Sequence, residues 1–273
     1  MRMAMPSGFA LLQKKAPLAG AFFVAAIWHL PAQAFCPLPD KPQQVAVRQV
    51  VDGDTVRLSD GRSVRLIGIN APELGRKGRA SEPYAEAARL RLQALVKASD
   101  GRVGLVPGVE KKDKYGRTLA HIYGRNGDNL EAVLLGEGLG YHVAFAPNSR
   151  LAGCQQAAEH AARIARAGLW QRSPVQREGD VRRSGFTVIS GRITGLQRNG
   201  AGVWLDLGDT VVLHVPARLQ RNFPASFFDN LRGRQVEARG WMLDRSRKGG
   251  LKPGQRRWML PLTDPSMLQG TSG

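Results

Sequence analysis

The sequence has few cysteines, few acidic residues and, beyond its first 40 residues, no long apolar run. Its two cysteines, Cys36 and Cys154, are too few for a disulfide-rich scaffold or for a structural zinc site built on cysteine. No later segment reaches about 18 apolar residues, so we expect no stable membrane association of the mature chain. No repeat with a period of about 20–50 residues is visible, which argues against solenoids and propellers. HExxH, Walker A, Ser-x-x-Lys and nucleophile-elbow motifs are also absent.

The shortage of acidic residues leaves a strongly basic chain. The 273 residues include 40 Lys and Arg against 22 Asp and Glu, a formal charge of +18. Hydrophobic residues make up 42%, enough to form folded cores, so the basicity is not that of a disordered tail. An anionic partner is therefore expected. Charge alone is compatible with nucleic acid, an anionic membrane or acidic glycans.

The first 34 residues have the pattern of an export signal. Basic residues precede an apolar stretch over residues 16–30, and Ala-Gln-Ala at 32–34 is a small-residue cleavage pattern. We expect export to the periplasm or the medium, with an uncleaved membrane anchor as the alternative. In an oxidising compartment Cys36 and Cys154 can form a disulfide. The sequence leaves open whether they pair or whether Cys154 is only a buried helix residue.

Two strand-rich modules follow. Patterns in the first predict strands and helices, with Ser81 as the N-cap of the first helix. The predicted strands are 45–51, 55–58, 63–69, 103–106 and 118–123, and the helices are 81–99, 129–137 and 149–167. In the second module we predict strands at 186–196, 202–207, 210–215, 235–243 and 256–262, with a helix over 216–230. This order is that of a small OB-type barrel, a frequent platform for oligonucleotides.

The predicted boundaries divide the chain into six parts. A charged segment with one proline and no apolar periodicity is typical of a linker between the modules. The parts are a signal peptide at 1–34, an arm at 35–43, the first module at 44–171, the linker at 172–185, an OB-like nucleic-acid-binding module at 186–265 and a tail at 266–273. Trp204, Trp241 and Trp258 are expected to pack within the second barrel, with base stacking by an outward-facing ring as the alternative.

Two motifs in the first module carry side chains suited to phosphate chemistry. Asp52 and Asp54 flank a glycine in VVDGDTVRL, so their carboxylates can point to one side as the chain enters a strand. VRLIGINAPE places Arg65 in a strand and Asn70 and Glu73 in the turn after it. An arginine inside an apolar strand needs a partner, which Glu73 or a bound phosphate would supply.

A third motif, DKYGR, places Asp113, Tyr115 and Arg117 around a glycine turn that opens a strand. The three motifs together hold oxygen ligands for a hard cation, a further carboxylate and two arginines. These are the groups that phosphodiester hydrolysis needs, because a metal polarises phosphate oxygens, a base activates water and guanidiniums match the charged transition state.

In this order DGDT, RLIGINAPE, DKYGR and a closing GLW resemble the staphylococcal nuclease (thermonuclease) family over residues 43–171. The resemblance implies an OB barrel decorated with three helices, dependence on Ca²⁺, and cleavage of DNA and RNA to 3′-phosphate products. The expected fold class is α+β, mainly β: an OB-type five-stranded barrel with three helices, followed by a second small OB-like β-barrel.

The resemblance also implies a metal site. Asp54 matches a calcium-ligating aspartate, and Ala71 would lend its backbone carbonyl. Asn70 stands where the best-known form of the family has a second metal-binding aspartate. An amide oxygen still ligates a hard cation, but the site loses one negative charge, which is a main control of Ca²⁺ affinity.

By the same resemblance, other matched positions would serve in catalysis and substrate binding. Glu73 matches the glutamate that orients or deprotonates the attacking water, and Arg65 and Arg117 match two phosphate-clamping arginines. The remaining assignments are Lys114 and Tyr115 to substrate binding, and Asp52 and Thr55 to positions behind the metal ligands.

The sequence thus favours an exported, monomeric nuclease that acts on DNA or RNA. One alternative is a nuclease-like protein in which Asn70 weakens the metal site, so that it binds nucleic acid without turnover. Another is a basic protein that adheres to cell-wall polymers or anionic lipid.

Overall fold

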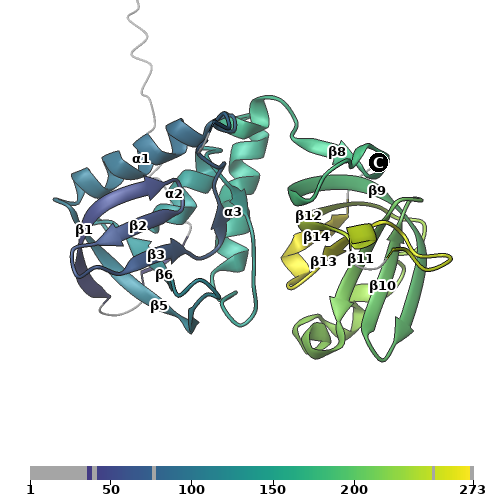
Figure 1. Ribbon diagram of the computed structural model, residues 1–273. Coiled ribbons are helices and arrows are strands. Elements are labelled where there is room, and N and C mark those ends of the chain that lie inside the picture. Colours follow the sequence, from purple (N-terminus) through teal and green to yellow (C-terminus); the bar gives the residue numbers. More distant parts are fainter. Residues whose placement is uncertain (1–35, 39–41, 76–77, 248–249, 271–273) are drawn as a thin grey trace, which may run out of the picture. The chain divides into compact units, whose positions relative to one another are not determined.

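The computed structural model describes residues 36–38, 42–75, 78–247 and 250–270; the predicted signal peptide at 1–34 lies outside them. The described residues form two five-stranded barrels of mixed strand direction, the first accompanied by three helices (Figure 1). The predicted α+β fold class is confirmed. No helix in these ranges is long and apolar enough to cross a membrane.

The first barrel closes in the order β1-β2-β3-β6-β5. Its strands are β1 (Gln43–Asp52), β2 (Thr55–Leu58), β3 (Ser63–Leu66), β5 (Arg102–Lys112) and β6 (Thr118–Tyr123). Strand β3 ends three residues earlier than predicted, because Gly68 adopts a φ of 90° and turns the chain. The next residues form β4 (Ile69–Asn70), which pairs with β7 (Tyr141–His142) outside the barrel.

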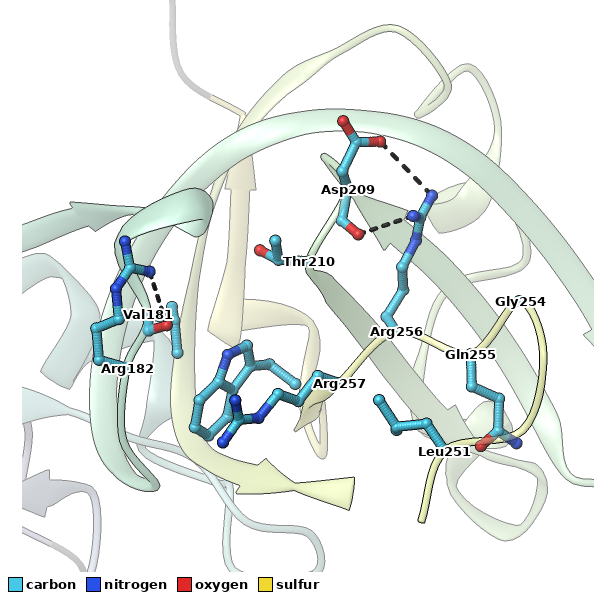
Figure 2. A pocket seen from close by; sticks show the side chains of 10 residues that line it. Val181, Arg182, Asp209, Thr210, Leu251, Gly254, Gln255, Arg256 and Arg257 are labelled. Carbon is cyan, nitrogen blue, oxygen red and sulfur yellow. Dashed lines mark hydrogen bonds and ion pairs between the residues drawn. The ribbon is translucent and has the colours of Figure 1, made fainter. Parts of the chain in front are cut away.

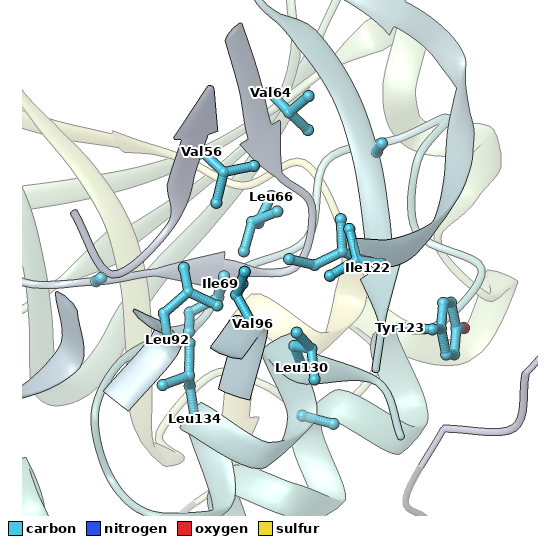
Figure 3. Packing of buried hydrophobic residues seen from close by; sticks show 14 of the residues in the cluster. Val56, Val64, Leu66, Ile69, Leu92, Val96, Ile122, Tyr123, Leu130 and Leu134 are labelled. Atoms are coloured by element: carbon cyan, nitrogen blue, oxygen red, sulfur yellow. The ribbon is translucent and has the colours of Figure 1, made fainter. Parts of the chain in front are cut away.

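Helices α1 (Ala85–Ala98), α2 (Leu130–Gly136) and α3 (Ala152–Ile164) complete the first module. Figure 3 shows Leu92 of α1 and Leu134 of α2 among the apolar side chains of the core. The predicted N-cap Ser81 is wrong, since α1 begins after Tyr84 and has no side-chain cap. The Ser81 hydroxyl instead accepts a hydrogen bond from the Gly75 N–H and stabilises the loop after β4.

A disulfide joins Cys36 to Cys154 of α3, across a sequence separation of 118 residues. A crosslink that closes so long a loop stabilises the fold mainly by restricting the unfolded chain. The N-terminal segment at Cys36 is thereby attached to the helix.

Removing this crosslink should lower the free energy of unfolding. The double variant Cys36→Ser/Cys154→Ser is expected to lose about 2–4 kcal/mol relative to the oxidised wild type, measured by urea unfolding. Wild type unfolded in reductant is the matched control and should behave like the double variant. Equal stability of the oxidised wild type and the double variant would contradict the expectation.

The second barrel runs β9-β10-β11-β13-β12 and closes where β12 pairs with β9. Its strands are β9 (Gly185–Asn199), β10 (Gly202–Leu207), β11 (Val211–Pro216), β12 (Gln235–Asp244) and β13 (Trp258–Pro261). Within the barrel the β11–β13 pair is parallel and the other pairs are antiparallel. This arrangement agrees with the five strands predicted for the second module.

One expected helix of the second module was wrong, and two short strands lie in segments for which the sequence predicted none. The segment predicted as a linker contains β8 (Val175–Arg177), which pairs with β9. This strand is short and largely exposed, so it shows no apolar pattern in the sequence. The predicted helix over 216–230 is two short 3₁₀ helices, because Pro224 lacks an N–H and disfavours helical backbone at Phe223. The expected tail contains β14 (Leu268–Gly270), which pairs with β12.

The short 3₁₀ helices lie at turns and strand ends. They are η1 (Gly168–Gln171), η2 (Glu178–Asp180), η3 (Ala217–Asn222), η4 (Ala225–Phe228), η5 (Arg245–Arg247) and η6 (Pro265–Met267).

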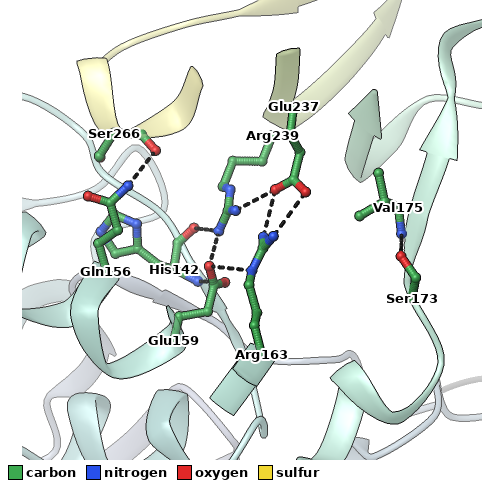
Figure 4. A network of polar contacts seen from close by, with 9 residues as sticks. All are labelled: His142, Gln156, Glu159, Arg163, Ser173, Val175, Glu237, Arg239 and Ser266. Atoms are coloured by element: carbon green, nitrogen blue, oxygen red, sulfur yellow. Dashed lines mark hydrogen bonds and ion pairs between the residues drawn. The ribbon is translucent and has the colours of Figure 1, made fainter. Parts of the chain in front are cut away.

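A buried ionic network joins α3 to β12 (Figure 4). Arg239, which is 1% exposed, contacts Glu159 Oε2 at 2.5 Å and Glu237 Oε1 at 2.7 Å. Arg163 binds both Glu237 oxygens, at 2.6 and 2.9 Å, and lies 3.3 Å from Glu159. Two carboxylates therefore balance two guanidiniums. The Arg239–Glu159 and Arg163–Glu237 contacts link α3 to β12, and the other two contacts lie within α3 or within β12.

His142 of β7 lies beside this network. The backbone N–H of His142 donates to Glu159 Oε1 at 2.9 Å, and the side chain of His142 is fully buried. Among the described residues neither ring nitrogen has a hydrogen-bond partner. Burial, reinforced by Arg239 and opposed by Asp264, lowers the pKa of His142 to about 3. The ring is therefore neutral near pH 7.

This histidine should make stability depend on pH. An unfolded histidine gains a proton near pH 6.5, whereas the folded state resists protonation until about pH 3, so stability falls as the pH drops through this interval. Between pH 7 and pH 5 the contribution of His142 should fall by about 2 kcal/mol. Urea unfolding at several pH values measures it, and His142→Leu should flatten the profile. Parallel profiles for the two proteins would exclude this role.

Candidate active site

The turn between β1 and β2 holds two buried carboxylates. The Asp54 N–H donates to Asp52 Oδ1 at 3.1 Å, and both side chains are at most 9% exposed. A Cβ on Gly53 would lie 2.6 Å from the Cβ atoms of Ala71 and Ala88. Glycine therefore allows this turn to pack tightly against the segment after β4 and against α1.

Asp54 is held by three neighbouring groups. Its Oδ2 accepts from the Ala71 N–H at 2.8 Å and lies 3.1 Å from Arg65 Nη2, and its Oδ1 accepts from the Thr55 hydroxyl at 3.0 Å. Thr55 and Arg65 are direct partners in the antiparallel β2–β3 pair. Strand register thus brings the arginine to the carboxylate.

The Arg65 guanidinium also reaches Asn70. Nη2 donates to Asn70 Oδ1 at 3.3 Å, and Nη1 donates to the carbonyls of Leu66 and Ile69 at 2.9 and 2.8 Å. One guanidinium therefore bridges the side-chain oxygens of Asp54 and Asn70, the two residues assigned to metal binding.

Burial raises the pKa of Asp54 to about 7; Arg65 opposes this shift and Asp52 adds to it. The hydrogen bonds from Ala71 and Thr55 also favour the charged carboxylate. A buried carboxylate of this kind is stabilised in its charged form by a nearby cation.

The chemistry of these donors fits a hard cation. Asp52, Asp54 and Asn70 offer side-chain oxygens, which Ca²⁺ prefers, and burial of Asp54 favours added positive charge. Within the described ranges no group of three or more His, Cys, Asp or Glu side chains gathers in metal-binding geometry. The Ala71 N–H is bonded to Asp54, and its carbonyl, which the family resemblance assigns to the metal, is a further oxygen beside these side chains.

Glu73 lies in the loop that follows β4, with an exposed side chain. Its N–H donates to Glu82 Oε2 at 2.9 Å, and the Glu82 N–H donates to the Glu73 carbonyl at 2.9 Å. These two bonds close the loop and fix the backbone of Glu73. Sequence reasoning missed Glu82, because no motif marks a partner nine residues away.

The DKYGR turn forms a second cluster around Asp113. Asp113 Oδ1 accepts from the backbone N–H groups of Tyr115 and Arg117, each at 2.9 Å, and Oδ2 accepts from Arg117 Nε at 2.7 Å. Gly116 has a φ of 80°, which this tight turn requires. Tyr115 is 72% exposed, with Lys114 Nζ and the Arg117 guanidinium 5.0 and 5.6 Å from its ring centroid.

Strand pairing relates these clusters. Strand β3 runs parallel to β6, with Val64 opposite Thr118 and Arg65 opposite Leu119. Arg117 therefore comes directly before β6, and β6 pairs with β3, which carries Arg65. Contacts unite six predicted site residues at the first cluster: Asp52, Asp54, Thr55, Arg65, Asn70 and Ala71. Lys114, Tyr115 and Arg117 gather at the second, and Glu73 is bonded to Glu82 in the loop after β4.

Comparison with known proteins places these features in a family. Residues 63–172 match the staphylococcal nuclease homologue family. A thermonuclease of Staphylococcus intermedius is 35% identical over 130 residues, which cover 46% of this chain and 75% of the relative. Endonuclease YncB of Bacillus subtilis is 30% identical over 134 residues, 47% of this chain and 62% of the relative.

The prophage-derived endonuclease YokF of Bacillus subtilis is 31% identical over 134 residues, 47% of this chain and 44% of the relative. The chain thus spans less than two thirds of two of these three relatives, and the second barrel lies beyond the family match, which ends at residue 172. Over its first barrel the chain has the fold, the motif order and the similarity to thermonuclease, and it belongs to the staphylococcal nuclease family of phosphodiester hydrolases.

Proposed function

We propose that this protein is an exported, Ca²⁺-dependent endonuclease that hydrolyses phosphodiester bonds of DNA or RNA. The observation that carries the proposal is the buried contact set in which Arg65 bridges Asp54 and Asn70. It joins oxygen donors for a hard cation to a guanidinium that matches phosphate oxygens.

The proposed roles follow from these positions. Asp54 and Asn70 would hold the cation, which when bound polarises a phosphate oxygen. Arg65 and Arg117 bind the phosphate and stabilise the charge that grows on it during attack. Glu73, exposed and fixed by its backbone bonds to Glu82, orients and deprotonates the attacking water.

Plasmid cleavage tests the proposed reaction. Purified protein with Ca²⁺ should convert supercoiled plasmid to nicked and linear forms, and excess chelator should stop the conversion. Equal cleavage with and without chelator would reject the metal dependence, and no cleavage in any condition would reject the enzyme.

Export is proposed from two features. The signal-like pattern of residues 1–34 and the disulfide between Cys36 and Cys154 both suit an oxidising compartment. Mass spectrometry of protein recovered from the periplasm or the medium should find a chain that starts at Phe35. A cytoplasmic, full-length, reduced chain would reject export.

A second candidate function is nucleic-acid binding without turnover. Asn70 supplies no negative charge, and the Arg65 guanidinium contacts both proposed ligands, so a cation has to compete with a positive group. This protein would bind DNA at low salt and leave it intact with or without Ca²⁺.

Asn70→Asp should tighten Ca²⁺ binding, because it restores a negative ligand beside Asp54. We expect the dissociation constant for Ca²⁺ to fall on the order of tenfold, measured by isothermal titration calorimetry. Asn222→Asp in the second barrel adds the same charge elsewhere and should leave that constant unchanged. An equal effect of the two substitutions would mean that Asn70 is not a ligand.

A further inference from the structure

The outer face of β10 and β11 carries a stacked pair of rings. Trp204 and His214 are direct cross-strand partners, with ring centroids 3.8 Å apart and planes 17° from parallel. Val203 and Leu205, on either side of Trp204, are fully buried in the core, so Trp204 faces outward. Trp258, by contrast, is 5% exposed and belongs to the core. The expectation that all three tryptophans pack inside the barrel is therefore wrong for Trp204. It is also wrong for Trp241, which is outside the core cluster and packs against Phe145 and Phe186.

Hydrogen bonds hold both rings in place. Trp204 Nε1 donates to Asn199 Oδ1 at 3.1 Å, and His214 Nε2 lies 3.2 Å from the Ala201 carbonyl. Burial lowers the pKa of His214, so the stacked imidazole is neutral at pH 7. The pair is a fixed, uncharged aromatic surface on the outside of the barrel.

A guanidinium without a carboxylate lies beside the rings. The Arg245 guanidinium is 5.6 Å from the Trp204 ring centroid, and its Nη1 donates to the Arg256 carbonyl at 3.4 Å. Across the described part of the chain no Asp or Glu forms an ion pair with Arg245, whereas Arg257 binds Asp244 at 2.9 Å. The positive charge of Arg245 is thus available to an anion.

Basic residues continue from this point into a groove of about 480 Å³. Arg256 forms ion pairs with Asp206 at 3.7 Å and with Asp209 at 3.8 Å, and it lines the groove together with Arg182 and Arg257 (Figure 2). Residues 172–273 hold 17 Lys and Arg against eight Asp and Glu. Arginine side chains therefore extend from the aromatic pair to the groove.

We propose that this face of the second barrel binds a single-stranded polynucleotide, with a base stacked at Trp204 and backbone phosphates at Arg245 and Arg256. A stacking surface suits an unpaired base, because duplex bases are covered by their neighbours. The site goes beyond the proposed nuclease function and needs no cleavage. The site would bind a nucleic-acid strand through residues other than those assigned to hydrolysis.

Binding in chelator tests the site independently of catalysis. The full chain is titrated into fluorescein-labelled oligo(dT), and anisotropy gives the dissociation constant. Trp204→Leu should weaken binding about five- to 150-fold, which corresponds to the roughly 1–3 kcal/mol of one stacked base, and Trp204→Tyr should retain most of the affinity. A duplex of equal length should bind more weakly and respond little to Trp204→Leu.

Arg245→Gln provides a second readout. It should weaken binding and reduce the slope of log K against log salt by about 0.7, the value for one phosphate contact on a single strand. Arg232→Gln removes an exposed charge elsewhere on the barrel and is the matched control. If Trp204→Leu lowers the unfolding temperature, Arg245→Gln decides the test alone.

Three results would overturn the proposal. One is unchanged oligo(dT) affinity in folded Trp204→Leu or in Arg245→Gln. Another is a loss of oligo(dT) affinity in Arg232→Gln equal to that in Arg245→Gln, which would indicate binding by the overall positive charge rather than by a defined site. The third is preference for phosphatidylglycerol vesicles over oligo(dT) with the same dependence on Trp204, which would assign the face to lipid.

Discussion

Glu73→Gln is expected to slow DNA cleavage by about 10²–10⁴-fold, the usual contribution of a positioned general base. The amide is nearly isosteric with the carboxylate but cannot take a proton from water. The backbone bonds between Glu73 and Glu82 do not involve the replaced atoms, so both bonds can form in the variant. Initial rates on single-stranded DNA with saturating Ca²⁺ measure the effect.

The control is Glu86→Gln on α1, where the carboxylate pairs with Arg89 at the surface. It removes the same charge and should leave the rate within about twofold, since exposed ion pairs contribute little. A Glu73→Gln protein with wild-type rate and an unchanged unfolding temperature would show that another group activates the water.

Arg239→Met should be the most damaging substitution for stability outside the barrel cores. It leaves Glu159 without a 2.5 Å partner and Glu237 without a 2.7 Å partner in a site that is almost fully buried. Breaking a buried ion pair on one side costs about 3–5 kcal/mol, because a desolvated charge stays behind. Urea unfolding measures the loss, and α3 and the second barrel should lose protection from hydrogen exchange together.

Arg257→Met is the matched control, because Arg257 is about half exposed and pairs with Asp244 at 2.9 Å. Its loss of stability should be much smaller than that of Arg239→Met, because exposed ion pairs contribute little. Similar losses for the two variants, or independent exchange of α3 and β12, would mean that the ionic network does not couple the modules.

Much of the fold was predictable because its signals are local. Alternating apolar residues and glycine turns marked the strands of both barrels, and β2, β6 and β10 lie at their predicted positions. The departures depend on features without an apolar pattern. Strand β8 is stabilised by its backbone partner, and Gly68 interrupts β3 through its backbone angle.

The candidate site shows the same division. The sequence supplied the residue types of each motif, and strand register explains how Thr55 and Arg65 become neighbours. It could not predict that one guanidinium would bridge Asp54 and Asn70, or that Glu82 would fix the Glu73 loop. These contacts depend on how the segment after β4 returns toward the β1–β2 turn. No periodic pattern in the sequence predicts contacts between segments that lie so far apart along the chain.

Charge was likewise predictable in amount but not in arrangement. The excess of Lys and Arg indicated an anionic partner, yet it did not distinguish paired from unpaired side chains. Arg239 is buried in the ionic network, and Arg245 lies beside an outward-facing tryptophan with no acidic partner in the described structure. Of these two arginines, Arg245 is the one that a polynucleotide can reach.

The most direct test of the nuclease assignment is mass spectrometry of the products from a defined single-stranded DNA. With Ca²⁺ the wild-type protein should release fragments that end in a 3′-phosphate, with none formed in chelator. Intact substrate in both conditions, or fragments formed equally in chelator, would contradict the assignment of phosphodiester hydrolysis to the cluster at Asp54, Arg65 and Asn70.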